Sequence, residues 1–274
     1  MNVVPLAMYA AALIAYALHF SRRNPAMGKT ATTVLVAGAL AHTFVIGMQT
    51  MEAGHVPITS TTPFISTFVW LLALAYLYME MSTDERAMGV FILPLLVALQ
   101  AIPALNPGLE DRSPVLQGPL FGLHVSSLLF AYASFALACV IGITYVLLFK
   151  EIKAKHLGFF YARLPSLQVL DSMNHRAILI GWIFLTVGMV VGAVWTAQAR
   201  AYAAGDPRVQ AMSLQDPKIF VALVSWAVYS FEVFAARRIG WGGRRAAYLS
   251  AIGFAIVLLN FVPISYFLTE SHNF

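Results

Sequence analysis

Long runs of apolar residues alternate with short polar segments along the whole 274-residue chain. A stretch of roughly 20 apolar residues is long enough to cross the hydrocarbon core of a bilayer. The backbone of such a segment must satisfy its hydrogen bonds internally, so each run is expected to form a helix. The runs are residues 3–20, 31–50, 63–81, 88–105, 121–149, 177–195, 219–236 and 248–268. The pattern therefore predicts an all-α polytopic membrane protein with about eight transmembrane helices.

Composition supports the same class of protein. Hydrophobic residues make up 60% of the chain and charged residues 11%, proportions that exclude an ordinary soluble domain. No linker, low-complexity tract or internal repeat divides the sequence, so residues 1–274 are expected to form a single integral-membrane domain. The first run lacks a preceding basic region and a small-residue cleavage site, and we interpret it as a retained helix.

The distribution of basic residues predicts how the helices are oriented. If the amino terminus is outside, one side of the membrane collects most of the 17 lysines and arginines. These are Arg22, Arg23, Lys29, Arg86, Lys150, Lys153, Lys155, Arg163, Arg176, Arg237, Arg238, Arg244 and Arg245, against Arg112, Arg200, Arg208 and Lys218 on the other side. Because basic residues favour cytoplasmic loops, both termini are predicted to lie outside. The membrane is expected to be the cell's inner (cytoplasmic) membrane. The net charge of +5 then reflects topology and contact with the lipid bilayer, and no nucleic-acid partner is expected.

Cysteine chemistry is not expected in this chain. The single Cys139 lies inside the fifth run, which leaves no disulfide framework. The sequence also has no C-x-x-C-H motif for covalent heme attachment and no C-x-x-C redox pair. We interpret Cys139 as a small packing residue.

Four histidines lie on the outer side, or in the outer half, of the predicted topology. His124 is at the start of the fifth run, His272 follows the eighth, and His55 lies in the first outer loop. Neutral imidazole is a common axial ligand of heme, so His124 and His272 can bracket one iron; alternatively, they anchor their helices at the interface. His42 lies inside the second run, where an unpartnered imidazole is costly. It is either a third ligand or a partner of heme propionates, or it hydrogen-bonds to a neighbouring helix.

Several motifs occur in the same order as in one known family. From Gly181 the chain reads GWIFLTVGMVVGAVWTAQA, followed after a loop by LQDPKIFVALVSWAVY. Before them come FGLHVSSLLFAYASF and the connector LPSLQVLDSMNHRAI, and after them GWGGRRAAYLSAIGF and a final SHNF. In this order the chain resembles the cytochrome c assembly proteins of the CcsA/HemX-like, heme-handling type. The resemblance covers nearly the whole chain.

The resemblance implies a function and a set of site residues. It makes His124 and His272 the pair that ligates the heme iron, with Trp195 and Asp216 as retained parts of the outer loop. The bound group is then non-covalent heme b, held as cargo or as a cofactor at the outer face. The implied function is heme handling in cytochrome c maturation, with apocytochrome c and a second membrane subunit of the CcsB/ResB type as partners.

The outer loop departs from the family pattern, which has tryptophans before the aspartate. Ser213 and Gln215 occupy those positions, and only the Asp216-Pro217-Lys218 stem remains. Without these flat aromatic surfaces, the chain is not expected to be a stand-alone enzyme, although it can be a component of a heme lyase or synthase system. This departure places it nearer to the HemX-like branch.

Other interpretations remain open at the level of sequence. The same histidines can hold a permanent heme, or none, in an anchoring subunit of a respiratory electron-transfer complex. The chain can also regulate heme biosynthesis through its basic loops. Glu232, near the basic end of the seventh run, is either a ligand or proton relay or, as we expect, an ion-pair partner of Arg237 or Arg238.

Overall fold

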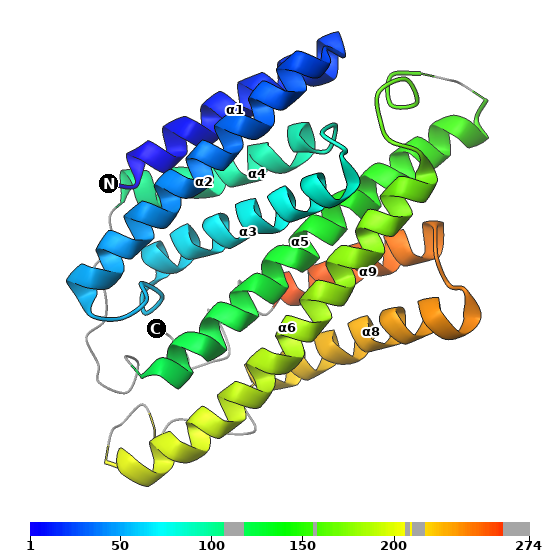
Figure 1. The fold of residues 1–274 in the computed structure, drawn as a ribbon. Coiled ribbons are helices and arrows are strands. Elements are labelled where there is room, and N and C mark those ends of the chain that lie inside the picture. The colour runs from blue at the N-terminus through cyan, green and yellow to red at the C-terminus, as the bar shows by residue number, and fades with distance from the viewer. Residues whose placement is uncertain (107–117, 156–157, 206–208, 210–216, 260–274) are drawn as a thin grey trace.

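The computed structural model describes residues 1–106, 118–155, 158–205, 209 and 217–259, and its regular secondary structure in these ranges is helical (Figure 1). The helices are α1 Val3–Arg22, α2 Pro25–Ala53, α3 Thr61–Thr83, α4 Gly89–Leu105, α5 Pro119–Lys153, α6 Leu167–Tyr202, α8 Pro217–Ile239 and α9 Arg244–Leu259. Each overlaps one of the predicted apolar runs, so the all-α prediction is confirmed.

Helix length and composition identify a multi-pass membrane protein. Six helices, α1, α2, α3, α5, α6 and α8, are long and apolar enough to cross a bilayer. Helix α4 has only 17 residues, at the lower limit of about 17 for a span. Helix α9 is described over 16 residues, and residues 260–268 of the predicted eighth run lie outside the described part of the chain. Six clear spans and two shorter helices thus correspond to the eight predicted runs.

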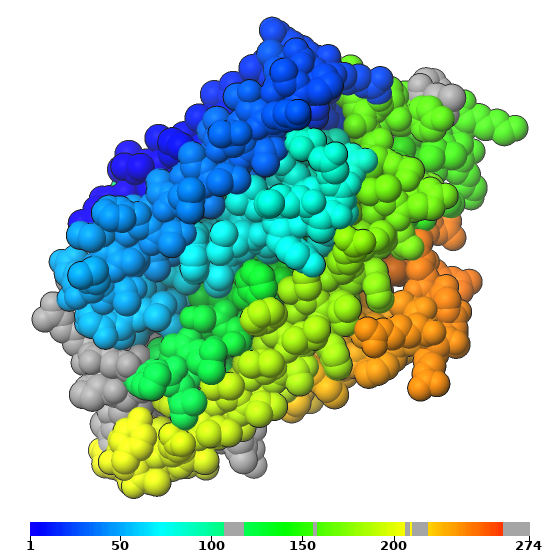
Figure 2. Space-filling model, in the orientation of Figure 1, coloured from blue at the N-terminus to red at the C-terminus, as the bar shows by residue number. Residues whose placement is uncertain are grey.

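Helices α5 and α6 sit at the centre of the bundle. Helices α1, α2, α3 and α4 pack on one side of this pair, and α8 and α9 pack on the other (Figure 1). In the orientation of Figure 1, the space-filling view shows α1, α2, α3 and α6 as parts of one continuous surface (Figure 2). Close approach of α5 and α6 depends on glycine: a Cβ atom at Gly181 would lie 2.4 Å from the ring of Phe135.

Both central helices extend beyond their apolar runs, to 35 residues in α5 and 36 in α6. Helix α6 begins at Leu167 rather than at residue 177, with Ser166 as a cap that accepts a hydrogen bond from the Val169 amide. The polar residues in the first turns of α6 are accommodated because some of their side chains face other helices. Asn174, for example, is 2% exposed and donates to Ser250 of α9 at 2.9 Å.

A buried carboxylate joins the first three helices at the end of the bundle that carries most of the basic residues. Glu80 of α3 is 1% exposed and accepts hydrogen bonds from the hydroxyls of Tyr16 and Thr32. Arg86, in the α3–α4 turn, lies 3.9 Å from the same carboxylate and pairs with Asp84 at 2.9 Å. Because its oxygens are all partnered, this acidic group is compatible with its buried position.

Candidate functional site

His124 lies in the second turn of α5, half-buried against α6. Its Nδ1 is 2.7 Å from the carbonyl oxygen of Gly188. Because a carbonyl oxygen can only accept, Nδ1 carries the proton, and the neutral ring has its lone pair on Nε2. Metal-binding histidines are commonly oriented in this way, by donating the other ring N–H to a backbone carbonyl. His124 is therefore held in the tautomer that ligation through Nε2 requires.

Gly192 of α6 makes room for the His124 ring. A Cβ atom at this position would lie 2.4 Å from both Cε1 and Nδ1 of the imidazole, far inside van der Waals contact. One turn later on α6, the indole of Trp195 lies nearly parallel to the imidazole, with ring centroids 6.2 Å apart and planes inclined by 16°. The Gly-Ala-Val-Trp sequence thus positions His124 in two ways: its glycine leaves space for the imidazole, and its tryptophan lies beside the ring.

Trp195 belongs to an apolar cluster at this end of the bundle. Its ring centroid is 5.1 Å from that of Phe121, and the side chain is 6% exposed. Other buried members of the cluster are Ile58, Leu129, Ala199 and Val209. The indole Nε1 is buried, with no hydrogen-bond partner among the described residues. A flat aromatic surface with an unused donor, beside a histidine of this tautomer, is suited to a planar apolar ligand that carries acceptor groups.

His42 is fully buried and lies in a different part of the bundle. Its Nδ1 is 3.0 Å from the hydroxyl of Tyr9 on α1, and its Nε2 is 2.9 Å from the hydroxyl of Ser66 on α3. Neither partner belongs to the cluster around Trp195. The sequence left two roles open for His42, in a heme site or in hydrogen bonds between helices. In this geometry His42 makes hydrogen bonds to the neighbouring helices.

His55, in the loop between α2 and α3, is a buried histidine at the His124 end that the sequence did not single out as a ligand. Its Nδ1 is 3.0 Å from the carbonyl oxygen of Val56, and the side chain is 8% exposed. Its Nε2 is buried without a hydrogen-bond partner in the described ranges. Ile58, from the same loop, packs in the cluster with Trp195. This loop is buried by contacts between segments that are distant in the sequence. Because the loop lies outside the apolar runs, the sequence gave no indication that His55 would be buried.

Similarity to known proteins decides the family. A sequence model of the cytochrome c assembly proteins matches residues 2–272. The chain belongs to the cytochrome c assembly protein family. The order of motifs had indicated this family, and that prediction is confirmed. Membership gives the chain a role in cytochrome c maturation.

Similar proteins in this family include several named cytochrome c biogenesis protein CcsA. The protein of Guillardia theta is 24% identical over 252 residues, covering 85% of this chain and 81% of that protein. The protein of Heterosigma akashiwo is 28% identical over 240 residues, covering 74% and 72%. That of Prochlorococcus marinus is 24% identical over 291 aligned positions, covering 95% and 89%. The similarity thus extends over most of each protein.

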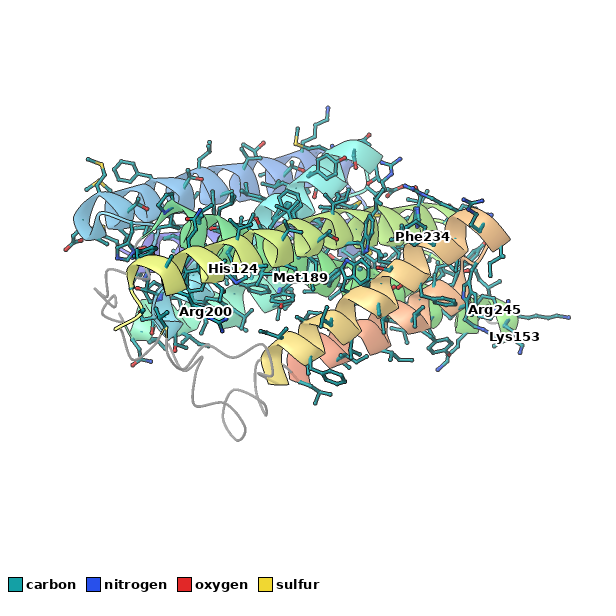
Figure 3. The ribbon with its side chains drawn as sticks, turned by 90° about the horizontal axis from the view of Figure 1, so that it is seen from below. His124, Lys153, Met189, Arg200, Phe234 and Arg245 are labelled. Carbon is teal, nitrogen blue, oxygen red and sulfur yellow. The ribbon has the colours of Figure 1, made fainter. Side chains whose placement is uncertain are left out.

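The structure brings together two of the predicted heme-site residues, His124 and Trp195. His272 and Asp216 lie outside the described residues, as do Ser213 and Gln215 of the outer loop. The pairing of His272 with His124 and the place of Asp216 in the site therefore stay predictions. Figure 3 shows His124 and Arg200 at one end of this assembly-family protein, and Lys153 and Arg245 at the other. Arg200 is exposed in the last turn of α6.

Glu232 of α8 does not form the predicted ion pair. It is 2% exposed, and its Oε1 accepts a hydrogen bond from the Ser250 hydroxyl at 3.0 Å. Arg237 and Arg238 are exposed, and within the described ranges no ion pair joins either of them to Glu232. The reason is helical geometry, because residues five and six positions apart do not share a helix face. Glu232 instead connects α8 to α9.

Proposed function

We propose that this family member binds non-covalent heme b at the His124 end of the bundle, on the outer face of the cytoplasmic membrane, and hands it on during cytochrome c maturation. The main support is the environment of His124. Its Nδ1 donates to the Gly188 carbonyl, and the Trp195 indole lies parallel to its ring. A histidine held in this way offers Nε2 to iron, and a buried aromatic beside it offers surface to a porphyrin.

The residues at this end fit the parts of a heme molecule. His124 and His272 would hold the iron, His124 through Nε2, and Asp216 would belong to the outer loop of the site. Trp195 and Phe121 would contact the porphyrin, and Arg200 would neutralise a propionate. When bound, heme supplies the vinyl groups that become attached to cytochrome c. His42 would join this site only by giving up its bonds to Tyr9 and Ser66.

Heme binding is tested by replacing His124 with glycine, with His19→Gly as a matched control. His19 is also a helical histidine with Nδ1 near a backbone carbonyl, that of Asn24 at 2.9 Å, but it lies at the basic end. We expect purified wild-type protein and H19G to show the same Soret band. H124G lacks the proposed ligand itself and should bind heme at least tenfold more weakly, since the loss of ligand orientation alone has an effect of about that size. Added imidazole should restore the band, because it fills the vacated space.

The decisive contrary result is an H124G protein that keeps an unchanged heme content and spectrum. It would remove His124 as a ligand. A double variant, His124→Gly with His272→Gly, should show no Soret band. If only His272→Gly abolishes the band, then the axial ligand is His272 and the partner of His124 is not iron.

We also propose that heme attachment requires a second membrane subunit. Ser213 and Gln215 cannot provide the aromatic faces of tryptophan, each of which contributes about 0.5–1.5 kcal/mol beyond burial. Two axial ligands can hold the iron while the porphyrin lacks the fixed orientation that a positioned reaction needs. In a host without its own cytochrome c maturation system, this chain should yield no covalent cytochrome c. Co-expression of a CcsB/ResB-type subunit should restore it, whereas attachment by the chain alone would contradict the proposal.

A further inference from the structure

A depression of about 330 Å³ lies at the opposite end of the bundle from His124. It is formed between the end of α5 and the turn from α8 to α9, and we call it the α8–α9 pocket. Its side chains come from Phe149, Ile239, Trp241, Arg244 and Arg245, and glycines of the turn complete its wall. The sequence had marked this turn as the GWGGRRAA motif, yet heme binding at the other end gives it no role.

Two arginines give the pocket a positive charge. The Arg244 guanidinium lies 5.3 Å from the centre of the Phe149 ring, and that of Arg245 lies 5.7 Å from the centre of the Trp241 ring. Within the described residues, neither guanidinium forms an ion pair with a carboxylate. The aromatic contacts orient both groups but leave their N–H donors available.

Two carboxylates at this end of the bundle accept hydrogen bonds from backbone amides and form no ion pair with either arginine within the described residues. Asp171 of α6 accepts a hydrogen bond from the Gly243 amide at 2.7 Å. Glu151, near the end of α5, accepts from the amides of Phe160 and Tyr161 at 3.2 and 2.6 Å. Lys150 and Lys153 are exposed on the same end of α5 and add to the positive potential. The pocket is therefore suited to an anion supplied from outside the chain.

The surface next to the pocket is apolar. Towards the middle of the bundle, α8 exposes Phe231 (49%), whose ring centroid is 5.0 Å from that of Trp241, and α9 exposes Tyr248 (46%) and Ile252 (56%). These helices belong to a membrane protein, so such exposed side chains face acyl chains. A cationic pocket with a tryptophan at its edge, followed by an apolar surface, matches an amphiphile with a negatively charged head.

We propose that the α8–α9 pocket binds the phosphate of an anionic glycerophospholipid, whose acyl chains lie along α8 and α9. The planar guanidinium groups of Arg244 and Arg245 donate to the phosphate oxygens in a bidentate manner. A free phosphate ion would gain the same donors but none of the apolar contacts. The lipid is therefore the preferred source of the phosphate group in this open pocket.

Native mass spectrometry of delipidated protein, titrated with phosphatidylglycerol or phosphatidylcholine, tests this site. The variant is R244Q/R245Q, and the matched control is R22Q/R23Q, which removes the same charge from exposed arginines at the end of α1. We expect phosphatidylglycerol to bind R244Q/R245Q about thirtyfold more weakly than wild type, since two basic contacts are lost. The control should bind like wild type, and phosphatidylcholine should not distinguish the proteins.

A second measurement does not depend on the arginine variants and decides the matter if R244Q/R245Q does not fold. Brominated phosphatidylglycerol should quench tryptophan fluorescence more than brominated phosphatidylcholine, and Trp241→Phe should remove this difference. Equal binding by R244Q/R245Q and R22Q/R23Q, or a quenching difference that persists in W241F, would overturn the proposal. So would displacement of the lipid by an equal concentration of inorganic phosphate. None of these results bears on heme binding by His124, which is measured separately.

Discussion

His42, which is buried, and His124, which is half-buried, differ in the groups that surround their rings. His42 lies between the hydroxyls of Tyr9 and Ser66, which can each donate or accept, so both of its nitrogens are engaged whichever carries the proton. His124 faces the carbonyl of Gly188, which fixes the proton on Nδ1. His42 therefore joins α1, α2 and α3, whereas the Gly188 carbonyl selects the Nδ1–H tautomer of His124.

Replacing Gly192 by alanine should displace the His124 ring, because the new Cβ atom would lie 2.4 Å from it. We expect heme to bind about tenfold or more weakly, as for other losses of ligand orientation, while the helical circular dichroism stays unchanged. Gly47→Ala is the control, since nothing lies within 4 Å of a Cβ atom at that position on α2. It should leave heme binding intact and raise stability by about 0.5–1 kcal/mol. Wild-type heme affinity in G192A would show that heme binding does not need the observed position of the His124 ring.

At the scale of helices, apolar runs predicted where each described helix lies but not where it ends. Helix α6 begins at Leu167, before its apolar run, because polar residues in its first turns face partners on α9 and the α8–α9 turn. Asn174 bonds to Ser250, 76 positions away, and Asp171 bonds to Gly243, 72 positions away. Such pairs arise only when the helices are packed, so a local pattern cannot reveal them. The ring contacts of His42 and the burial of His55 were inaccessible from sequence for the same reason.

The contact between Asp171 and the start of α9 leads to a prediction about that helix. Asp171→Ala removes a charge-assisted hydrogen bond to the Gly243 amide, worth about 1.5–3 kcal/mol. Gly243 has a φ of +63°, so the turn itself depends on glycine and on this contact. Hydrogen–deuterium exchange should become faster at residues 242–246, with little change in α1–α3. Ser172→Ala, at the exposed neighbouring position, should exchange like wild type. Unchanged exchange in D171A would mean that α9 is held by its packing alone.

Over the whole molecule, the two ends of the bundle differ in charge and in chemistry. His124 lies at one end, whereas Arg245 and Lys153 lie at the other (Figure 3). Trp195 lies beside His124, and Ile58 from the loop of His55 belongs to the same cluster as Trp195. Glu80 lies beside Arg86 at the end rich in basic residues. Cytoplasmic loops favour basic residues, so this difference predicts that the His124 end is outside. The heme proposal depends on this orientation, since it assigns heme to the outer face.

Cysteine accessibility measures the orientation directly. In a Cys139→Ser background, Ser21→Cys and Gln198→Cys form a matched pair of exposed polar positions, the first near the end of α1 and the second near the end of α6. A membrane-impermeant maleimide added to intact cells should label Q198C and spare S21C, which should react only after the membrane is opened. Labelling should be equal for both in detergent, which controls for intrinsic reactivity.

The reverse labelling pattern would have a specific consequence. It would place His124 and Trp195 in the cytoplasm while leaving their geometry unchanged, so heme binding and heme delivery would have to be considered separately. A Soret band lost in H124G would then still assign the ligand, but at the face where the basic loops were expected. The positive charge of the α8–α9 pocket would lie outside, and its lipid would come from the outer leaflet. Orientation thus decides which compartment each end of the bundle serves, whereas the spectra of the His124→Gly and His272→Gly variants decide which histidine holds heme.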